Sequence, residues 1–467
     1  MRKARTVLTR NPLPRQFVMS MRLICPIVLF VSALLAPHAA LSAAEETDDG
    51  ANPLRFYHHA DGSFLQATFG LDLAFFSQGN AWYGNDRGVL KGHTVGSWWE
   101  SLIHPGLEGS YVLPNTQTLY ARIDATLANT FGGIDAGGTN SRMGDVSWLG
   151  IDNVYAGWRS GTLFGKLGQD FLDLSFGRQI YATGTGFLFA SEGVAGFQRA
   201  AYYLGGRKSA SYAAIARMKS SAWSGDLFYF KDNAIGPDST WAGGCTVEYA
   251  VADTATLGGS LAAIASDLPD RDGMRVFDLR GSIKPFALGK GPKVLQPLTL
   301  AGEFVREGRD RGMAAGFGWY AAVSYQWSGL PWQPELTYRY ASFDQHYDPL
   351  FYHFTDWGSW FQGEIVGEYD RSNSNLDSHM LRLKVQPVEP LTLNLFYYRF
   401  SLHNPGFSEV RPSHYADEWN LIADWTVNSH LTVSLVGALA IPGDGATALL
   451  GGNSNWTATM VMATVKY

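Results

Sequence analysis

The chain has 467 residues, of which only 17 % are charged, where about 25 % is usual for a soluble domain. Aromatic residues make up 14 %, there are 52 glycines, and no long apolar segment occurs after the first 44 residues. This composition disfavours a helical protein and favours alternating β-strands, and the length suits two or three soluble domains or one large barrel.

The first 44 residues have the layout of a cleaved secretory signal peptide. Basic residues precede an apolar run at 23–41, which ends in small residues. Pro26, Pro37 and the small-residue exit argue against the alternative, a transmembrane anchor. Cleavage would remove six basic and no acidic residues, changing the formal net charge from −6 to −12. It would also remove Cys25 and leave Cys245 alone, so no internal disulfide is expected.

The rest of the chain consists mainly of segments in which apolar and polar side chains alternate. In residues 117–131, Leu119 and Ile123 share one face, while Arg122 and Asp124 share the other. Similar alternation recurs at residues 64–78, 148–160, 170–179, 210–219, 222–231, 255–265, 275–285, 297–307, 316–328, 333–343, 376–386, 391–402, 416–427, 431–440 and 456–467. Since successive strand residues point to opposite faces, each segment predicts a strand between apolar and aqueous surroundings.

Short turns and longer loops separate these segments. Short turns are expected at residues 112–116, 386–390 and 426–430, and longer loops at 80–97, 131–147, 180–193, 404–415 and 441–455. This organisation is typical of transmembrane barrels, which in bacterial single-chain proteins have even strand numbers. We therefore predict an all-β fold, a single antiparallel transmembrane β-barrel of about 18 strands over residues 64–467. A periplasmic lead-in is expected at residues 45–63.

A secreted soluble sandwich or propeller would also show alternating strands. Large aromatic residues at the strand ends of the apolar face favour the membrane barrel, because barrels carry aromatic girdles at both interfaces: Trp319, Trp327, Trp419 and Trp425. No repeat of 40 to 50 residues indicates propeller blades. The last segment alternates up to Tyr467, which we expect to face lipid, with Lys466 at the mouth of the lumen.

Residues 345–375 do not follow the pattern. In the stretch 356–370, Phe361, Ile365 and Tyr369 are four residues apart, which is helical spacing, although a strand is also tolerable. One long excursion over 345–375 restores the alternation of turns and loops. We predict a folded loop that restricts the bore, with these gating residues: Asp356, Trp357, Trp360, Glu364 and Glu368.

The polar faces of the strands carry charged residues that could select solutes. We predict that the following residues line the pore and bind anions: Arg122, Asp124, Arg159, Arg178, Arg339, Arg382 and Arg399. A guanidinium binds carboxylates bidentately, and rings of basic residues in a pore select anions. Each charge could instead pair across strands, as in any water-filled barrel. With a net charge of −12, an anion-selective excess must be local.

The sequence predicts no enzyme. Asp377, Ser378 and His379 resemble a catalytic triad, but neighbouring strand residues point to opposite faces, so Ser378 and His379 cannot meet. The histidines lack metal-ligand spacing, and the glycine-rich segments lack the strand-to-helix context of phosphate loops. No catalytic residue, cofactor, metal or nucleic-acid partner is expected.

Several motifs resemble the alginate export family of outer-membrane barrels. They are "LSFGRQ" at 174–179, "YRYASFDQHYDPLFY" at 338–352, "SNSNLDSHMLRLKVQP" at 372–387 and "GGNSNW" at 451–456. The resemblance implies a monomeric 18-stranded barrel that conducts a polyuronate through an arginine-lined constriction, with inward Arg122, Arg178, Arg339 and Arg382. The "DWGSWFQGEIVGEY" stretch is more typical of a broad subgroup than of dedicated alginate exporters, which leaves the solute open.

The leading hypothesis is therefore a Gram-negative outer-membrane channel for an anionic solute such as a uronate polysaccharide or oligosaccharide. Its expected partners are outer-membrane lipid, the anionic saccharide and the outer-membrane assembly machinery. A general diffusion porin is the alternative within transport. From other classes, an outer-membrane hydrolase would need an outward Ser/His pair near one rim, and an adhesion module would use the aromatic loop at 347–361.

Overall fold

The computed structural model describes residues 53–193, 196–235, 238–288, 291–309, 314–354, 357 and 360–467. Leu54–Tyr467 form one compact unit. The expected signal peptide, including Cys25, and the expected gating residue Asp356 lie outside the described residues. Within the described ranges, no helix is both long and apolar enough to cross a membrane.

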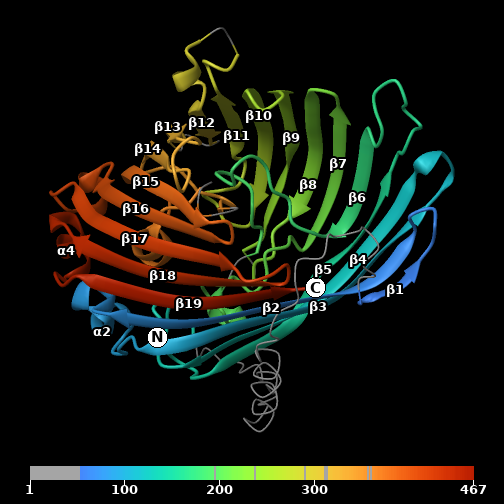
Figure 1. Cartoon of the computed structure of the whole chain (residues 1–467). Helices are drawn as coiled ribbons and strands as arrows, with labels where there is room; N and C mark the ends of the chain where they lie inside the picture. The colour runs from blue at the N-terminus through green and yellow to red at the C-terminus, as the bar shows by residue number, and fades with distance from the viewer. Residues whose placement is uncertain are drawn as a thin grey trace, which may run out of the picture. The chain divides into compact units, whose positions relative to one another are not determined.

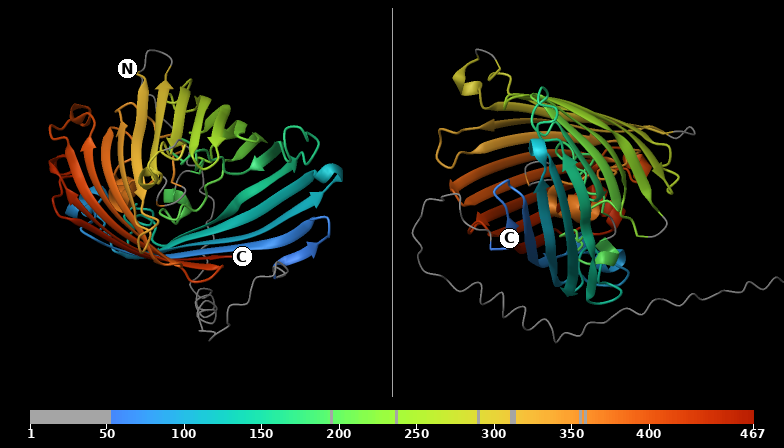
Figure 2. Two further views of the ribbon diagram at one scale, coloured as in Figure 1. Left: turned by 45° about the horizontal axis from the view of Figure 1, so that its top comes forward. Right: turned by 90° about the vertical axis from the view of Figure 1, so that its right-hand side faces the viewer.

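Eighteen antiparallel strands form a closed barrel (Figures 1 and 2), which confirms the predicted fold. Each strand pairs with the next in sequence, and the last pairs with the first. The strands are β2 (Phe64–Gly79), β3 (Ser97–Val112), β4 (Thr118–Gly132), β5 (Val146–Arg159), β6 (Leu172–Arg178), β7 (Tyr212–Ser220), β8 (Trp223–Lys231), β9 (Thr240–Val251), β10 (Ala255–Ser266), β11 (Arg275–Ile283), β12 (Leu298–Gly308), β13 (Gly316–Gln326), β14 (Glu335–Phe343), β15 (Leu376–Val388), β16 (Leu391–Leu402), β17 (His414–Thr426), β18 (Leu431–Pro442) and β19 (Trp456–Lys466).

Strands β3 and β9 lie outside the alternating segments recognised in the sequence. Strand β3 contains Pro105 and Gly106, where its pairing with β4 skips from Ile103 to Gly106. Strand β9 contains Gly243 and Gly244 on opposite faces. Glycine removes the contrast between apolar and polar faces, so the two-residue period is lost although the backbone continues the ladder.

Strands β19 and β2 close the barrel, and the pairing extends to the last residue. The backbone N–H of Tyr467 donates to the Phe69 carbonyl at 2.8 Å, and the Phe69 N–H donates back at 3.0 Å. A short strand, β1 (Arg55–His58), then continues along the same edge, with Arg55 opposite Gln66. Residues of the expected lead-in therefore cover the part of β2 that β19 does not reach, which protects an otherwise exposed edge.

The connections differ strongly between the two rims. We call the short-turn end the rim that carries the connections 113–117, 160–171, 221–222, 252–254, 284–297, 327–334, 389–390 and 427–430, and the opposite rim the long-loop end. The long-loop end carries α2 (Asp86–Val89) after β2 and α4 (Asp444–Leu450) after β18. Its two longest connections are 179–211, which contains α3 (Gly196–Arg199), and 344–375, which contains η5 (Gly363–Asp370).

The outer face of the barrel is apolar and has aromatic residues near both rims. Exposed rings near the short-turn end are Tyr111, Trp223, Tyr249, Trp327, Trp425 and Tyr467, and those near the long-loop end are Trp99, Tyr212, Tyr229 and Trp419. Exposed leucines such as Leu227, Leu261 and Leu435 lie between the two belts. This distribution is that of a transmembrane barrel. Tyr467 shares the outward parity of Val461, as expected, and its ring stacks on His430 at 4.2 Å.

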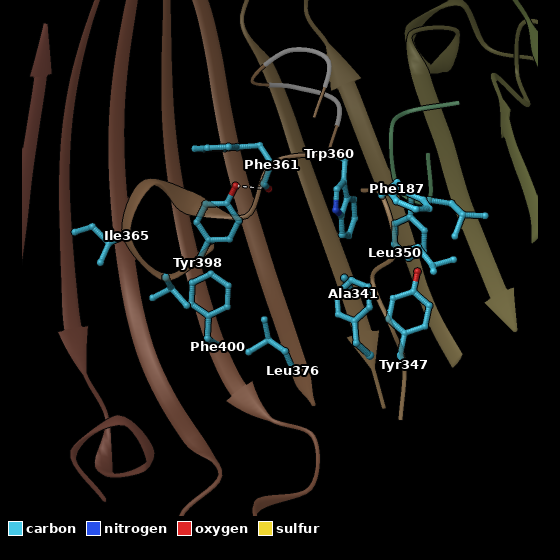
Figure 3. Close-up of a cluster of buried hydrophobic side chains, with 14 of the residues drawn as sticks. Phe187, Ala341, Tyr347, Leu350, Trp360, Phe361, Ile365, Leu376, Tyr398 and Phe400 are labelled. Carbon is cyan, nitrogen blue, oxygen red and sulfur yellow. Dashed lines mark hydrogen bonds between the residues drawn. The ribbon is translucent and has the colours of Figure 1, made fainter. Parts of the chain in front are cut away.

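The hydrophobic core lies inside the barrel (Figure 3). The described residues of 179–211 and 344–375 pack against the inward faces of the strands. The ring centres of Phe187 and Trp360 are 4.6 Å apart, and those of Phe361 and Phe396 of β16 are 5.3 Å apart. Aromatic side chains therefore point inward from the wall near the long-loop end. We call the described residues of 179–211 and 344–375 together the lumen plug.

Candidate functional site: the lumen plug and its cavity

The two parts of the lumen plug are joined to each other. Phe189 and Phe351 form a parallel backbone bridge, and the His353 N–H donates to the Gly186 carbonyl at 2.9 Å. The Tyr203 hydroxyl donates to the Glu364 carboxylate at 2.8 Å. These contacts join segments that are far apart in sequence, so the plug is one folded unit rather than two independent loops.

Helix η5 shows that residues 363–370 of the predicted loop are helical and not a strand. It is a π-helix, and two inward residues of β17 bind its N-terminus. The carboxylate of Glu418 accepts hydrogen bonds from the backbone N–H groups of Ile365 at 3.0 Å and Val366 at 2.8 Å. The side-chain oxygen of Asn420 accepts one from the backbone N–H of Glu364 at 3.2 Å. A carboxylate at this position satisfies free N–H groups and complements the helix dipole.

Residues before η5 are bound from the opposite direction by β14 and β16. The Phe361 carbonyl accepts a hydrogen bond from the Tyr398 hydroxyl at 2.8 Å (Figure 3). It also accepts one from the Arg339 guanidinium. The same guanidinium lies 4.2 Å from the centre of the Trp360 ring, and Trp360 is buried. Arg339 is thus inward, as predicted, but beneath the plug. Its position suits it to hold residues 360–362 rather than to contact a solute directly.

The 179–211 part is bound to the wall by β3, β4 and β5. The buried Glu100 carboxylate accepts from the Leu204 N–H at 3.0 Å. Thr130 accepts from the Ala201 N–H at 2.7 Å, and Asp152 accepts from the Ser209 hydroxyl at 2.8 Å. Polar anchors on β3–β5 and on β14–β17 therefore hold the plug across the lumen.

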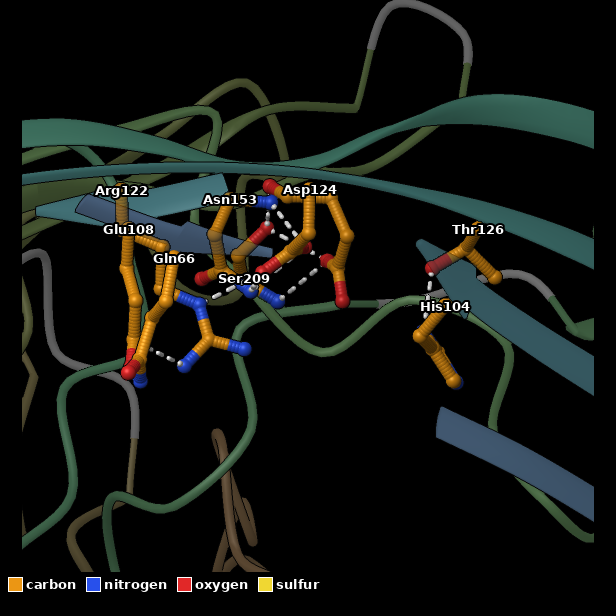
Figure 4. Close-up of polar contacts among 9 residues, drawn as sticks. Gln66, His104, Glu108, Arg122, Asp124, Thr126, Asn153 and Ser209 are labelled. Atoms are coloured by element: carbon orange, nitrogen blue, oxygen red, sulfur yellow. Dashed lines mark hydrogen bonds and ion pairs between the residues drawn. The ribbon is translucent and has the colours of Figure 1, made fainter. Parts of the chain in front are cut away.

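Two predicted pore-lining arginines face the part of the lumen toward the short-turn end. Arg122 lies 2.8 Å from Asp124 and 3.4 Å from Glu108 (Figure 4), and Asp124 also accepts from the Asn153 side chain. Arg159 pairs in the same way, 3.4 Å from an oxygen of Asp173 and over the Tyr120 ring. Both arginine side chains stay partly exposed, 38 % and 48 %, so they can still meet a solute.

Arg382 and Arg178 have different surroundings. Arg382 is inward and buried, with Nε and Nη2 donating to the Asn394 side chain at 3.0 and 2.9 Å. Arg178 ends β6 directly after Gly177, whose φ of 133° interrupts the strand alternation. Burial and the nearby charge of Arg178 lower the pKa of Arg199, a residue of the plug. The anion-binding role of Arg178 stays a prediction.

Arg399 faces away from the lumen, which corrects its assignment as a pore-lining residue. On β16 the buried residues are Phe396, Tyr398 and Phe400, and Arg399 is exposed between them. Its cross-strand neighbours are His379 and an outward acidic residue of β17. The assignment failed because aromatic residues of this strand face the plug, so the apolar face is the inner one here.

A cavity of about 610 Å³ lies between the plug and the wall formed by β2 and β19. Four basic residues line it: Arg199, Arg207, Lys208 and Lys466. Two acidic residues, Asp72 and Glu368, and several aromatic residues, including Tyr202, Tyr203, Tyr352, Phe354 and Trp357, complete the lining. Lys466 lines the lumen, as its strand parity predicted. The cavity therefore combines cations with flat apolar surfaces.

The basic residues that the plug contributes to the cavity were not predicted from the sequence. Arg207 and Lys208 lie in the segment "GGRKS" at 205–209, outside every predicted strand. Adjacent basic residues in a glycine-rich loop were the available signal, but the strand alternation that predicts lumen-facing residues does not extend into this loop. Their approach to Lys466 depends on the fold of the plug, which no local pattern indicates.

The described gating residues all belong to the plug. The ring of Trp357 packs against that of Phe361, with the ring centres 5.3 Å apart, and Trp360 is buried in the hydrophobic core. Burial raises the pKa of Glu364 from 4.5 to about 8, and the neighbouring Glu368 and Glu418 add to the shift. Burial likewise raises the pKa of Glu368 to about 8; Glu100 contributes and Lys208 opposes. Protonation of these carboxyl groups therefore favours the docked plug.

Near the long-loop rim of the outer face, Ser342, Asp377 and His403 form a polar cluster. The Ser342 hydroxyl donates to Asp377 Oδ1 at 2.6 Å, and His403 Nδ1 lies 3.0 Å from the same oxygen. A catalytic serine instead donates to the imidazole, whose other nitrogen faces the acid. The cluster lacks that arrangement. Ser378 and His379 face opposite sides of the sheet, as predicted.

The described residues contain no group of three or more potential ligands that could hold a metal ion. No family model matches the chain, and no curated protein is similar to it in sequence. Membership of the alginate export family is therefore not shown.

The fold of the chain is similar to that of several solved outer-membrane porins, which match it over most of its length. A BenF-like porin from Pseudomonas fluorescens Pf-5 is 14 % identical, with a TM-score of 0.56 over 86 % of this chain and 98 % of that one. OprD from Pseudomonas aeruginosa is 15 % identical, with a TM-score of 0.55 over 88 % and 95 %. OpdK from the same organism, solved with vanillate, is 13 % identical, with a TM-score of 0.54 over 86 % and 98 %.

Proposed function

We propose that this chain is a channel in the Gram-negative outer membrane that passes anionic solutes and that the lumen plug restricts its bore. The observation that carries the proposal is the lumen cavity, where Lys208 of the plug and Lys466 of the wall line the same space. The two aromatic belts and the likeness to porin barrels support the membrane location. Such barrels have short periplasmic turns and longer outer loops, so the long-loop end would face outward.

Uronate oligosaccharides are the proposed solute class. Their carboxylates suit the basic lining of Arg207, Lys208 and Lys466, and their ring faces suit the aromatic side chains of Tyr352 and Trp357. Arg122 and Arg159 would guide the solute in the half of the lumen nearer the short-turn end. The channel would act as a monomer, inserted by the outer-membrane assembly machinery, without cofactor or catalysis.

Conductance of the purified barrel in planar lipid bilayers tests the proposal. Under a salt gradient, the sign of the reversal potential should show that anions permeate better than cations. A uronate of three or more sugar units should reduce the current more than a neutral saccharide of equal length. Lys208→Gln combined with Lys466→Gln should weaken both effects. Cation preference would refute the proposal, and equal block by neutral saccharides would favour a general diffusion porin.

An aromatic carboxylate is the second candidate solute. The cavity lining includes the rings of Phe354 and Trp357, and the solved OpdK structure, a similar fold, was obtained with vanillate. Vanillate added to the same bilayers distinguishes the two solutes. Stronger competition by vanillate than by a uronate of equal charge would select the aromatic acid.

A further inference from the structure

Two arginines, Arg275 and Arg306, lie on the outer face of the barrel at the long-loop end of the paired strands β11 and β12. On β11 the outward residues are Ile283, Leu279 and Phe277, and the series ends in Arg275. The outward series of β12 runs through Leu300 and Phe304 to Arg306. Each strand therefore changes from apolar to cationic at the same rim, the rim assigned to the outer side of the membrane under the proposed function.

The register makes these arginines diagonal neighbours. Arg275 lies opposite Gly308, and Arg306 lies opposite Phe277. Diagonal neighbours on one sheet face are about 7 Å apart, which is within reach of two long side chains converging on one group. Both side chains are exposed.

Neither arginine has a hydrogen bond or an ion pair with any residue of the described ranges. Their outward cross-strand neighbours are Ala263, Phe277 and Phe317, which carry no charge. Two adjacent positive charges above an apolar surface are unfavourable unless an anion neutralises them. No described residue supplies that anion, which leaves the pair able to bind one from outside the chain.

We propose that Arg275 and Arg306 form a binding site for the phosphate group of a phosphorylated glycolipid in the outer leaflet. Guanidinium groups bind phosphate bidentately, and two of them suit one doubly charged phosphate monoester. Phe277, Phe304 and Phe317 provide the apolar surface for the acyl chains directly below. The inference rests on the membrane location and orientation given under Proposed function, but not on the solute.

Native mass spectrometry of the refolded mature chain in detergent tests the site. The probes are lipid A with two phosphates, its fully dephosphorylated form, phosphatidylglycerol and inorganic phosphate. The unmodified chain should retain diphosphorylated lipid A at least about tenfold better than the dephosphorylated form, the effect of one hydrogen bond to a charged group. Arg275→Gln combined with Arg306→Gln should abolish that preference.

Arg399→Gln is the matched control, because Arg399 is also outward near the same rim but has Asp417 as its cross-strand neighbour. It should retain the preference for phosphorylated lipid. A specific site would be refuted if the double variant kept the preference for diphosphorylated lipid A of the unmodified chain. It would also be refuted if Arg399→Gln lost that preference as fully as the double variant. Equal binding of phosphatidylglycerol would refute the glycolipid, and displacement by inorganic phosphate would refute a lipid site.

The lipid site and the channel can fail separately. The double variant should keep its conductance and anion preference, since both arginines lie outside the lumen. A chain that binds phosphorylated lipid through these arginines but conducts no ions would refute the channel alone. A conducting barrel without the lipid preference would refute the site alone.

Discussion

Glu418→Gln should release helix η5 from the wall and open the channel. The carboxylate of Glu418 accepts from the N–H groups of Ile365 and Val366 with one oxygen each. Glutamine keeps one acceptor oxygen, but its amide group cannot accept from the second N–H. Gly363 packs closely against this carboxylate, since a Cβ at that position would lie 2.6 Å from a Glu418 oxygen.

The magnitude follows from the two interactions that are lost. A hydrogen bond to a charged group contributes about 1.5 to 3 kcal/mol, and a charge at a helix N-terminus about 0.3 to 1 kcal/mol. Water replaces part of the lost bond once the helix moves, so we expect a net loss of about 2 kcal/mol. That corresponds to a roughly 30-fold increase in the ratio of open to closed dwell times.

Single-channel recordings in planar bilayers measure this ratio directly. Asp424→Asn is the matched control, because Asp424 is an inward acid of the same strand whose carboxylate accepts from Ser434. It removes one negative charge from β17 without removing a bond to η5. An unchanged ratio in Glu418→Gln, or an equal rise in both variants, would refute the view that Glu418 holds the plug.

Four further predictions concern selectivity, pH and assembly. Lys208→Gln should shift the reversal potential toward cation preference, since Lys208 lines the cavity. Arg399→Gln should leave it unchanged, since that side chain is outside the lumen; a shift would restore it as a pore residue. The pKa of Glu364 is about 8 in the docked plug, against an ordinary value of 4.5 for a free side chain. The docked form therefore binds more protons and loses stability as pH rises from 4 to 8. Open dwell times should lengthen over that range, and Glu364→Gln should flatten the profile. Deleting Tyr467 removes two backbone hydrogen bonds to Phe69, about 2 kcal/mol, and should lower the temperature at which the folded barrel unfolds in detergent gels. Tyr467→Phe, which keeps the backbone bonds, should unfold near the original temperature.

The two-residue period determined most of the barrel from the sequence. It located sixteen of the strands, because a wall between lipid and a lumen imposes opposite requirements on successive side chains. It failed at β3 and β9, where proline and glycine interrupt the contrast, although an even strand number made 18 the expected total. Helical spacing likewise indicated η5 within the 345–375 excursion.

The same period misassigned Arg399, for a reason that only the tertiary structure supplies. The rule that polar side chains face inward assumes a lumen filled with water. Near the long-loop end the lumen is filled by the plug, so Phe396, Tyr398 and Phe400 face inward and Arg399 faces out. Arg339 shows the related limit, since its inward parity was predicted but its burial under the plug was not.

The sequence by itself therefore determined the kind of wall, and the tertiary structure decided what that wall encloses. A strand's alternation is local, because each side chain responds to the medium on its own side. The cavity depends on closure of β19 against β2 and on the folding of two distant loops into one plug, which brings Lys208 to the same space as Lys466. Contacts between such distant residues are set by packing, and packing leaves no period in the sequence.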